Sequence, residues 1–332
     1  MKATLITDIA GPQLTDAERG WLTSPYLGGL ILFTRHFESK EQLKALVSEI
    51  SEINPKLIIT VDHEGGRVQR FRDGFTKVPA MGRLGELYES NKDQAKQTAY
   101  ASAIVLAYEL KQVGIHLTYA PVLDVDYDRN TVIGDRAFGK NTDVIEVLST
   151  EFMKGLKFMG FAAVGKHFPG HGWVNLDSHV ACPVDDRSYE KIEQEDMAPF
   201  AHQIKTIDWM MPAHVVFEKV DSESAGFSSY WLQDVLREKL GFTGRIVSDD
   251  LSMAGAAVKG SYQARAEAAL NAGCDILLAC NSSEASTEIL SAMEALNVAP
   301  ISLVEYMPQM ELDSEQNKAY QQALQRLNDL NG

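Results

Sequence analysis

The sequence predicts an α/β protein that folds as a single-domain (β/α)8 barrel of the TIM type. Short apolar segments recur eight times along the 332 residues, helical segments separate them, and polar residues follow nearly every apolar segment. Several of these segments are continuously apolar, which is typical of strands buried on both faces of a parallel sheet. We therefore expect a barrel over residues 1–300 and a partly helical extension, residues 301–332, packed on its outside.

The expected strands and helices alternate along the chain. The strands are expected at residues 3–9, 29–33, 57–61, 115–121, 161–165, 209–212, 245–247 and 275–279. The crossover helices are expected at residues 40–53, 92–113, 143–159, 188–205, 229–240, 262–272 and 283–296. Helices often end at glycine, and four of these segments are followed by one: Gly114, Gly160, Gly241 and Gly273. Eight strand–helix units favour the barrel, and a doubly wound open sheet is the alternative.

The composition is that of a globular protein with an acidic surface. Hydrophobic residues make up 45% of the chain, charged residues 23%, and the formal net charge is −15. Such a surface repels phosphate backbones and anionic lipids, so nucleic-acid and membrane partners are not expected. No stretch approaches the ~20 apolar residues of a membrane helix, and the N-terminus lacks a signal-peptide pattern. Three cysteines, Cys182, Cys274 and Cys280, match no disulfide or zinc pattern and indicate free thiols in a reducing compartment.

Polar residues collect where the expected strands end. In a barrel these ends gather on one face, which carries the active site. Burying so many charges without partners would cost several kcal/mol each, so packing alone does not explain them. Solvated loop charges are the alternative. The residues are Asp8, Arg35, His36, Asp62, His63, Glu64, Asp124, Asp126, Lys166, His167, His214, Asp249, Asp250 and Asn281.

Three segments resemble glycoside hydrolase family 3, and more closely its bacterial β-N-acetylglucosaminidase branch, which recycles cell-wall fragments. They are ITVDHEGG at 59–66, GKHFPGHGWVNLDSH at 165–179 and GFTGRIVSDDLSM at 241–253. LDV at 123–125 and GDRAFG at 134–139 also match that branch. The resemblance covers most of the chain, and its motifs come in the expected order.

The resemblance implies a barrel active site that uses neither metal nor cofactor. It also implies a cytoplasmic, single-domain enzyme, which we expect to be a monomer with a small sugar as its partner. The implied activity is that of a retaining exo-β-N-acetylglucosaminidase. Its implied substrate is an N-acetylglucosaminyl-1,6-anhydromuramoyl fragment, free or carrying a peptide. Many relatives carry a second domain that supplies a carboxylate acid/base, and here that residue must come from elsewhere.

Retaining hydrolysis needs a carboxylate nucleophile and a proton donor. Asp249 matches the family nucleophile, and its neighbour Asp250 is the rival, since adjacent strand residues point to opposite faces. His179 matches the acid/base of the branch, with Asp177 as its partner. An imidazole can donate and accept a proton near neutral pH, and a nearby carboxylate stabilises its protonated form.

Several other positions match residues that contact the sugar. They offer charged donors and acceptors to hydroxyl groups, although the two arginines could instead form ordinary surface ion pairs. Among the remaining residues, we expect His214 to line the pocket, His171 to position the loop, Glu64 to hold the site together and Trp173 to cover the sugar. The matching positions are Asp62, Arg70, Arg136, Lys166 and His167.

Four other functions fit parts of the pattern. The histidines allow a metal-dependent barrel hydrolase, although no His-x-His pair follows a strand. Lys166 at a strand end allows a Schiff-base aldolase. An N-acetylglucosamine phosphorylase would use phosphate in place of water, and a neutral histidine acid/base would repel that anion less than a carboxylate would. An inactive sugar-binding protein is the fourth.

Overall fold

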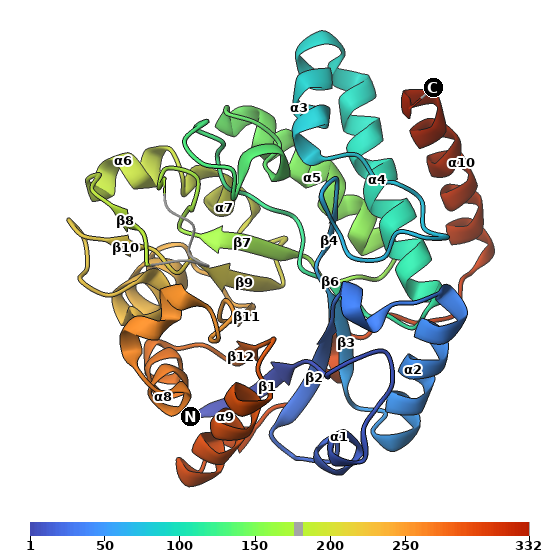
Figure 1. The fold of residues 1–332 in the computed structure, drawn as a ribbon. Helices are drawn as coiled ribbons and strands as arrows, with labels where there is room; N and C mark the ends of the chain where they lie inside the picture. The colour runs from blue at the N-terminus through green and yellow to red at the C-terminus, as the bar shows by residue number, and fades with distance from the viewer. Residues whose placement is uncertain (176–181, 332) are drawn as a thin grey trace.

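The computed structural model describes residues 1–175 and 182–331, and it is an α/β fold in which parallel strands are surrounded by helices (Figure 1). Each of the eight segments expected to form strands overlaps one. The eight strands are β1 (Lys2–Thr7), β2 (Leu27–Leu32), β3 (Ile58–Val61), β6 (Leu117–Thr118), β7 (Val164–Phe168), β9 (Trp209–Pro212), β11 (Arg245–Ile246) and β12 (Ile276–Ala279).

The eight strands form two parallel sheets whose edges meet. One has the order β12-β1-β2-β3-β6, with β13 (Ala299–Pro300) also on β1, and the other has the order β11-β9-β7. A parallel bridge between Val122 and Lys166 links the β6 side to β7. A second bridge, between Val247 and Ile276, links the β11 side to β12. The carboxyl ends of the strands therefore face a common region of the molecule.

Five helices confirm the predicted crossovers: α2 (Lys40–Ile53), α4 (Lys92–Gln112), α5 (Thr142–Phe158), α8 (Tyr262–Ala272) and α9 (Ser283–Ala295). The helix expected at 188–205 is instead two short ones, α6 (Tyr189–Gln194) and α7 (Ala198–Gln203). Pro199 lies in the first turn of α7, where its missing N–H is tolerated, and it favours a new start there. The segment expected at 229–240 forms a π-helix, η4 (Tyr230–Lys239).

Shorter elements complete the fold. Two small sheets pair β4 (His63–Gly65) with β5 (Val68–Gln69) and β8 (Val184–Asp185) with β10 (Val216–Phe217). Helices α1 (Asp16–Trp21) and α3 (Met81–Ser90) were not predicted. The 3-10 turns are η1 (Thr34–His36), η2 (Gly134–Arg136), η3 (Ala225–Phe227), η5 (Ala254–Lys259) and η6 (Val304–Tyr306).

One apolar cluster collects side chains from all eight strands or the residues beside them. It lies apart from the larger core between strands and helices, as expected where strands enclose an interior. Its members include Ile6, Ile31, Ile58, Leu117, Val164, Trp209, Val247 and Ile276.

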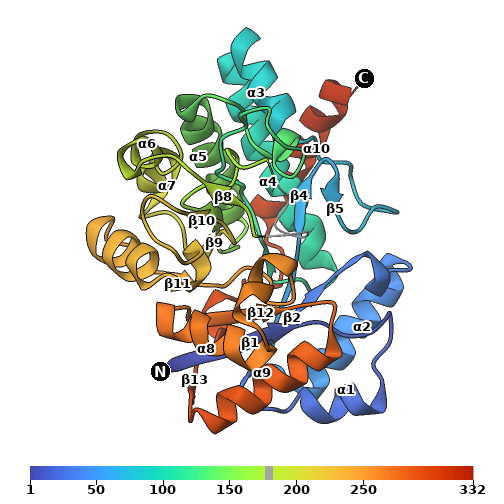
Figure 2. The same cartoon turned by 60° about the vertical axis from the view of Figure 1, so that its left-hand side comes forward.

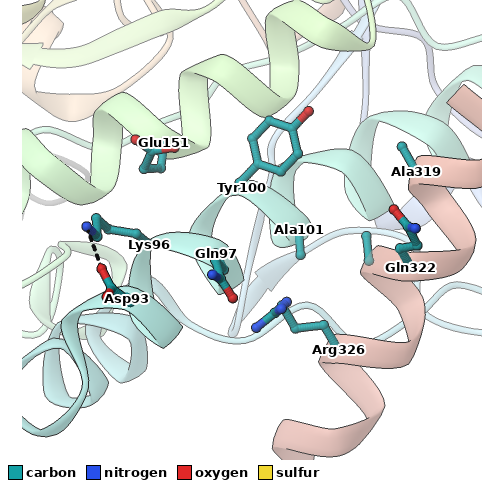
Figure 3. Close-up of a pocket in the computed structure, with 10 residues that line it drawn as sticks. Asp93, Lys96, Gln97, Tyr100, Ala101, Glu151, Ala319, Gln322 and Arg326 are labelled. Carbon is teal, nitrogen blue, oxygen red and sulfur yellow. Dashed lines mark ion pairs between the residues drawn. The ribbon is translucent and has the colours of Figure 1, made fainter. Parts of the chain in front are cut away.

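The C-terminal helix α10 (Ser314–Asn331) packs against α4 (Figure 2). The rings of Tyr108 and Tyr320 stack with their centroids 3.8 Å apart, and the Tyr320 hydroxyl donates to Glu109 at 3.0 Å. Side chains of α10, including Arg326, face those of α4 across a groove of about 720 Å³ (Figure 3). That the barrel ends at residue 300 stays a prediction. Among the described residues, no helix is long and apolar enough to cross a membrane.

Candidate active site

A polar cavity of about 610 Å³ lies at the carboxyl ends of the parallel strands. Its volume is in the range of small-molecule sites. The residues that follow β2, β3, β11 and β12 reach it, as does β7 itself. The predicted site residues that line it are Asp62, Arg70, Arg136, Lys166, His167 and Asp249.

Glu64 in β4 is the centre of a group of buried ion pairs. Its two oxygens accept hydrogen bonds from the Arg136 guanidinium at 2.8 and 2.9 Å, and Oε1 lies 2.6 Å from the Nζ of Lys166. Burial raises the pKa of Glu64, but Arg136 and Lys166 outweigh burial and hold that pKa well below its usual range. Glu64 therefore stays ionised at neutral and mildly acidic pH, and it fixes two cations that line the cavity.

The ion pairs continue to Asp62 and Arg70 on the cavity wall. Lys166 donates to Asp62 Oδ1 at 2.9 Å, and Arg70 lies 3.7 Å from Asp62 Oδ2. Only 13% of the Arg136 side chain and 3% of that of Lys166 are exposed, so their ion pairs are not surface ion pairs, whereas 34% of the Arg70 side chain is exposed. The cluster offers fixed cationic donors and a fixed carboxylate acceptor, which are strong partners for the hydroxyl groups of a sugar.

Asp124 is fully buried and holds the segment that contains His167 and His171. Its Oδ2 lies 2.7 Å from His167 Nδ1, and its Oδ1 accepts the backbone N–H of His171 at 2.8 Å. Asp124 had no predicted role, although its position directly after a predicted strand was a signal that could have identified it. Because Nδ1 is engaged, His167 has Nε2 to offer to a ligand.

His171 lines the cavity beside His167, with the two ring centroids 5.8 Å apart. Burial, reinforced by His167, lowers the pKa of His171 to about 4. It is therefore a neutral imidazole at pH 7, able to donate or accept a hydrogen bond without carrying charge.

The two neighbouring carboxylates differ in their surroundings. Asp250 accepts hydrogen bonds from the backbone N–H groups of Ser252 and Cys280 at 2.9 and 3.0 Å, and from the Ser252 hydroxyl at 2.8 Å. Burial raises the pKa of Asp250 to about 6. Asp249 accepts the backbone N–H of Asp250 at 2.8 Å. The Asp250 carboxyl thus fastens this loop to the end of β12, which favours Asp249 as the reacting group.

His214 does not line the cavity, contrary to the prediction. Its side chain is fully buried, packs 5.5 Å from the Phe227 ring, and turns Nε2 toward the Asp250 carbonyl at 3.2 Å. Burial lowers its pKa. His214 therefore supports the Asp249–Asp250 loop from behind.

The predicted acid/base pair, Asp177 and His179, lies outside the described residues. The segment before it is well anchored, since the Trp173 ring has Arg129 4.0 Å and Arg187 4.5 Å from its centroid. Trp173 is not among the residues that line the cavity, and its role of covering the sugar stays a prediction. A Cβ on Gly172 would lie 1.7 Å from the Val125 carbonyl, so this close approach requires glycine.

Within residues 1–175 and 182–331, no group of three or more His, Cys, Asp or Glu side chains is arranged to hold a metal ion. Two of the histidines make contacts other than to a metal ion. His167 contacts the Asp124 carboxylate, and His214 lies behind the Asp249–Asp250 loop and contacts the Asp250 carbonyl.

The chain matches the model of a known protein family. Residues 4–321 match the model of the glycosyl hydrolase family 3 N-terminal domain. The chain belongs to glycosyl hydrolase family 3. It is therefore a glycoside hydrolase, as the motifs around Asp62, Lys166 and Asp249 predicted.

Relatives within the family are similar over most of their length. A protein of Methylobacillus flagellatus named Beta-hexosaminidase is 49% identical over 292 residues, which are 87% of this chain and 84% of that protein. The native NagZ structure from Neisseria gonorrhoeae matches with a TM-score of 0.89 and 40% identity, covering 99% of this chain and 98% of that one. A NagZ complex with N-trifluoroacetyl-D-glucosamine matches with a TM-score of 0.87 and 38% identity, covering 98% of each chain.

Proposed function

We propose that this family 3 enzyme is a retaining exo-β-N-acetylglucosaminidase that removes terminal, non-reducing N-acetylglucosamine. The observation that carries the proposal is the placement of Asp249 in the same cavity as the Asp62–Lys166–Glu64–Arg136 cluster. A carboxylate there faces a sugar whose hydroxyls the cluster holds. The Beta-hexosaminidase relative and the NagZ complex with an N-acylated glucosamine support an N-acetylhexosamine in this position.

In the proposed first step, an Asp249 oxygen attacks the anomeric carbon and the glycosidic bond breaks. The electron pair of that bond leaves on the aglycone oxygen, which takes a proton from His179. In the second step, His179 removes a proton from water, and the water oxygen displaces the Asp249 carboxylate from the anomeric carbon. Asp177 would orient the His179 ring and stabilise its protonated form. Asp62, Arg70, Arg136, Lys166 and His167 would bind the sugar.

The proposed natural substrate is an N-acetylglucosaminyl-1,6-anhydromuramoyl fragment from peptidoglycan recycling, with or without its peptide, and the proposed location is the cytoplasm. The motifs at 59–66, 165–179 and 241–253, which resemble the branch that recycles cell-wall fragments, support the substrate. We also propose that the chain is a monomer, with residues 1–300 as one closed barrel and 301–332 as an extension. The two bridges between the sheets and the apolar cluster fed by all eight strands support closure.

The test is a comparison of β-nitrophenyl glycosides, assayed with and without phosphate. We expect the N-acetylglucosaminide to be cleaved much faster than the glucoside, with N-acetylglucosamine as the product in both buffers. Similar rates for the two sugars would contradict the proposed specificity. A sugar 1-phosphate formed only with phosphate would identify a phosphorylase instead of a hydrolase.

A further inference from the structure

A groove of about 770 Å³ lies next to the catalytic cavity, between α1 and α9. It is larger than that cavity, and the proposed chemistry leaves it unused. Both helices lie on the side of the molecule where β1, β2 and β12 meet, at the bottom of Figure 1. The groove therefore borders the strand ends where the proposed reaction takes place.

A cluster of three polar residues forms the border between the groove and the cavity. Arg35 is paired with Asp8 and donates to the side-chain oxygen of Asn281 at 2.7 Å. Asn281 lines both spaces. The Arg35 guanidinium also lies 4.8 Å from the ring centroid of Phe33, which lines the cavity. A ligand that extends from the cavity over Asn281 and Arg35 enters the groove.

The backbone of Asn281 marks this border as a specialised position. Its φ of 61° lies in the left-handed region, which non-glycine residues seldom occupy. In this conformation its N–H reaches Asp8 Oδ2 at 2.7 Å while its side chain meets Arg35.

One wall of the groove, on α9, is a row of hydrogen-bond acceptors. Ser283, Thr287 and Ser291 recur every four residues and share one face of the helix. The hydroxyls of Thr287 and Ser291 donate to backbone carbonyls one turn earlier, each at 2.9 Å, so their oxygens face outward as acceptors. The carboxylate of Glu294 continues the row. This wall suits a ligand with several N–H donors.

The opposite wall is aromatic. Trp21 at the end of α1 and Tyr26 just before β2 line it together with Pro25. Flat apolar surfaces facing acceptors accommodate an extended chain whose side groups pack on the rings while its amides face the acceptors. A peptide has this chemistry, whereas a simple alcohol or a single sugar ring would leave most of the groove unfilled.

We propose that the α1–α9 groove is a subsite for a peptide carried by the leaving group of the substrate. The proposal rests on the proposed glycosidase function and adds where the part of the substrate beyond the scissile bond lies. Asn281 and Arg35 form the crossing point, α9 receives the peptide N–H groups, and Trp21 and Tyr26 cover its side chains.

The test compares two substrates that share the scissile bond: the N-acetylglucosaminyl-anhydromuramic acid disaccharide with and without its peptide. Thr287→Trp places a bulky ring in the groove from an exposed helix position, away from the catalytic cavity. We expect the ratio of kcat/KM with peptide to kcat/KM without peptide to fall about tenfold, as when one or two polar contacts are lost. Glu288→Trp, on the same turn of α9 but outside the groove, is the matched control and should keep the wild-type ratio.

The subsite is overturned if the ratio for Thr287→Trp stays within about twofold of the wild-type ratio, because the lost contacts should change it about tenfold. A second measurement is independent of turnover: the peptide-bearing anhydromuramic acid is titrated calorimetrically into Asp249→Asn and Asp249→Asn/Thr287→Trp. Weaker binding in the double variant supports the groove, and equal binding refutes it. If wild-type enzyme cleaves no N-acetylglucosaminide, the glycosidase proposal fails, and this titration still decides the groove.

Discussion

Opposite charges alternate on one side of the catalytic cavity, whereas two like charges adjoin on the other. The first side, the paired half, consists of Asp62, Glu64, Arg136 and Lys166, joined by contacts of 2.6 to 2.9 Å. The second, the acidic half, consists of Asp249 and Asp250.

The two halves respond differently to protons. In the paired half, the cations keep the pKa of Glu64 well below its usual range, so its charge is constant near neutral pH. In the acidic half, burial raises the pKa of Asp250 to about 6. A constant charge suits binding, whereas a carboxyl group whose pKa is raised toward neutrality is typical of sites where bonds change. The comparison therefore predicts that the acidic half controls turnover and that the paired half controls affinity.

The largest expected effect is that of Asp249→Asn. An amide is a poor nucleophile, so kcat should fall by at least about 10⁴-fold while the sugar still binds. A 2-fluoro glycoside with a good leaving group should label the wild-type enzyme, and peptide mapping should place the label on Asp249. A label on Asp250 would move the nucleophile by one residue and reverse the roles within the acidic half.

His179→Ala should come next. Its loss should slow the natural disaccharide by about 10²–10⁴-fold, because a sugar alkoxide must be protonated as it leaves. A dinitrophenyl glycoside needs no proton, so its glycosylation step should slow far less. Azide needs no base and should rescue the second step as a β-glycosyl azide. If the rate falls equally for leaving groups of graded pKa and no azide product forms, His179 only binds or positions the sugar.

The fold was more predictable from the sequence than the site. Strand positions depend on local apolar runs such as that at β3, which can be read directly. The ion pairs depend on which strand ends meet, and Arg136 is 72 residues from Glu64. The motifs at 59–66 and 165–179 predicted Asp62 and Lys166 as site residues, and both line the cavity. The motifs could not show that His214 lies behind the Asp249–Asp250 loop, because that depends on packing against Phe227.

In the paired half, Glu64→Gln should weaken binding more than chemistry. The amide leaves Arg136 and Lys166 without their shared anion, and breaking such a buried pair typically costs about 3–5 kcal/mol of stability. Misplaced cations should raise KM severalfold more than they lower kcat, since Glu64 acts by positioning. Glu86→Gln is the matched control: Glu86 pairs with Arg83 2.8 Å away on the surface, where an ion pair is worth at most about 1 kcal/mol. A fall in kcat with no rise in KM would contradict the assignment of affinity to the paired half.

The smallest effect is a pH dependence of stability from Asp250. Its pKa rises from 3.8 to about 6 on folding, so the folded chain binds this proton more tightly than the unfolded chain does. Its contribution to stability is therefore greatest below the unfolded pKa and declines as pH rises toward about 6, by at most about 3 kcal/mol.

Asp250→Asn isolates the contribution of Asp250 to the pH dependence of stability, because the other titrating groups remain in both proteins. The free energy of unfolding of wild type minus that of the variant, from urea titrations between about pH 4 and about pH 7, should fall as pH rises. Repeating the pair in an Asp249→Asn background should give a smaller fall, since the negative charge of Asp249 helps to raise the pKa of Asp250. A difference that stays flat with pH would mean that Asp250 is ionised as readily in the folded chain as in the unfolded one. The acidic half would then resemble the paired half in its protonation, and the contrast between them would rest on geometry alone.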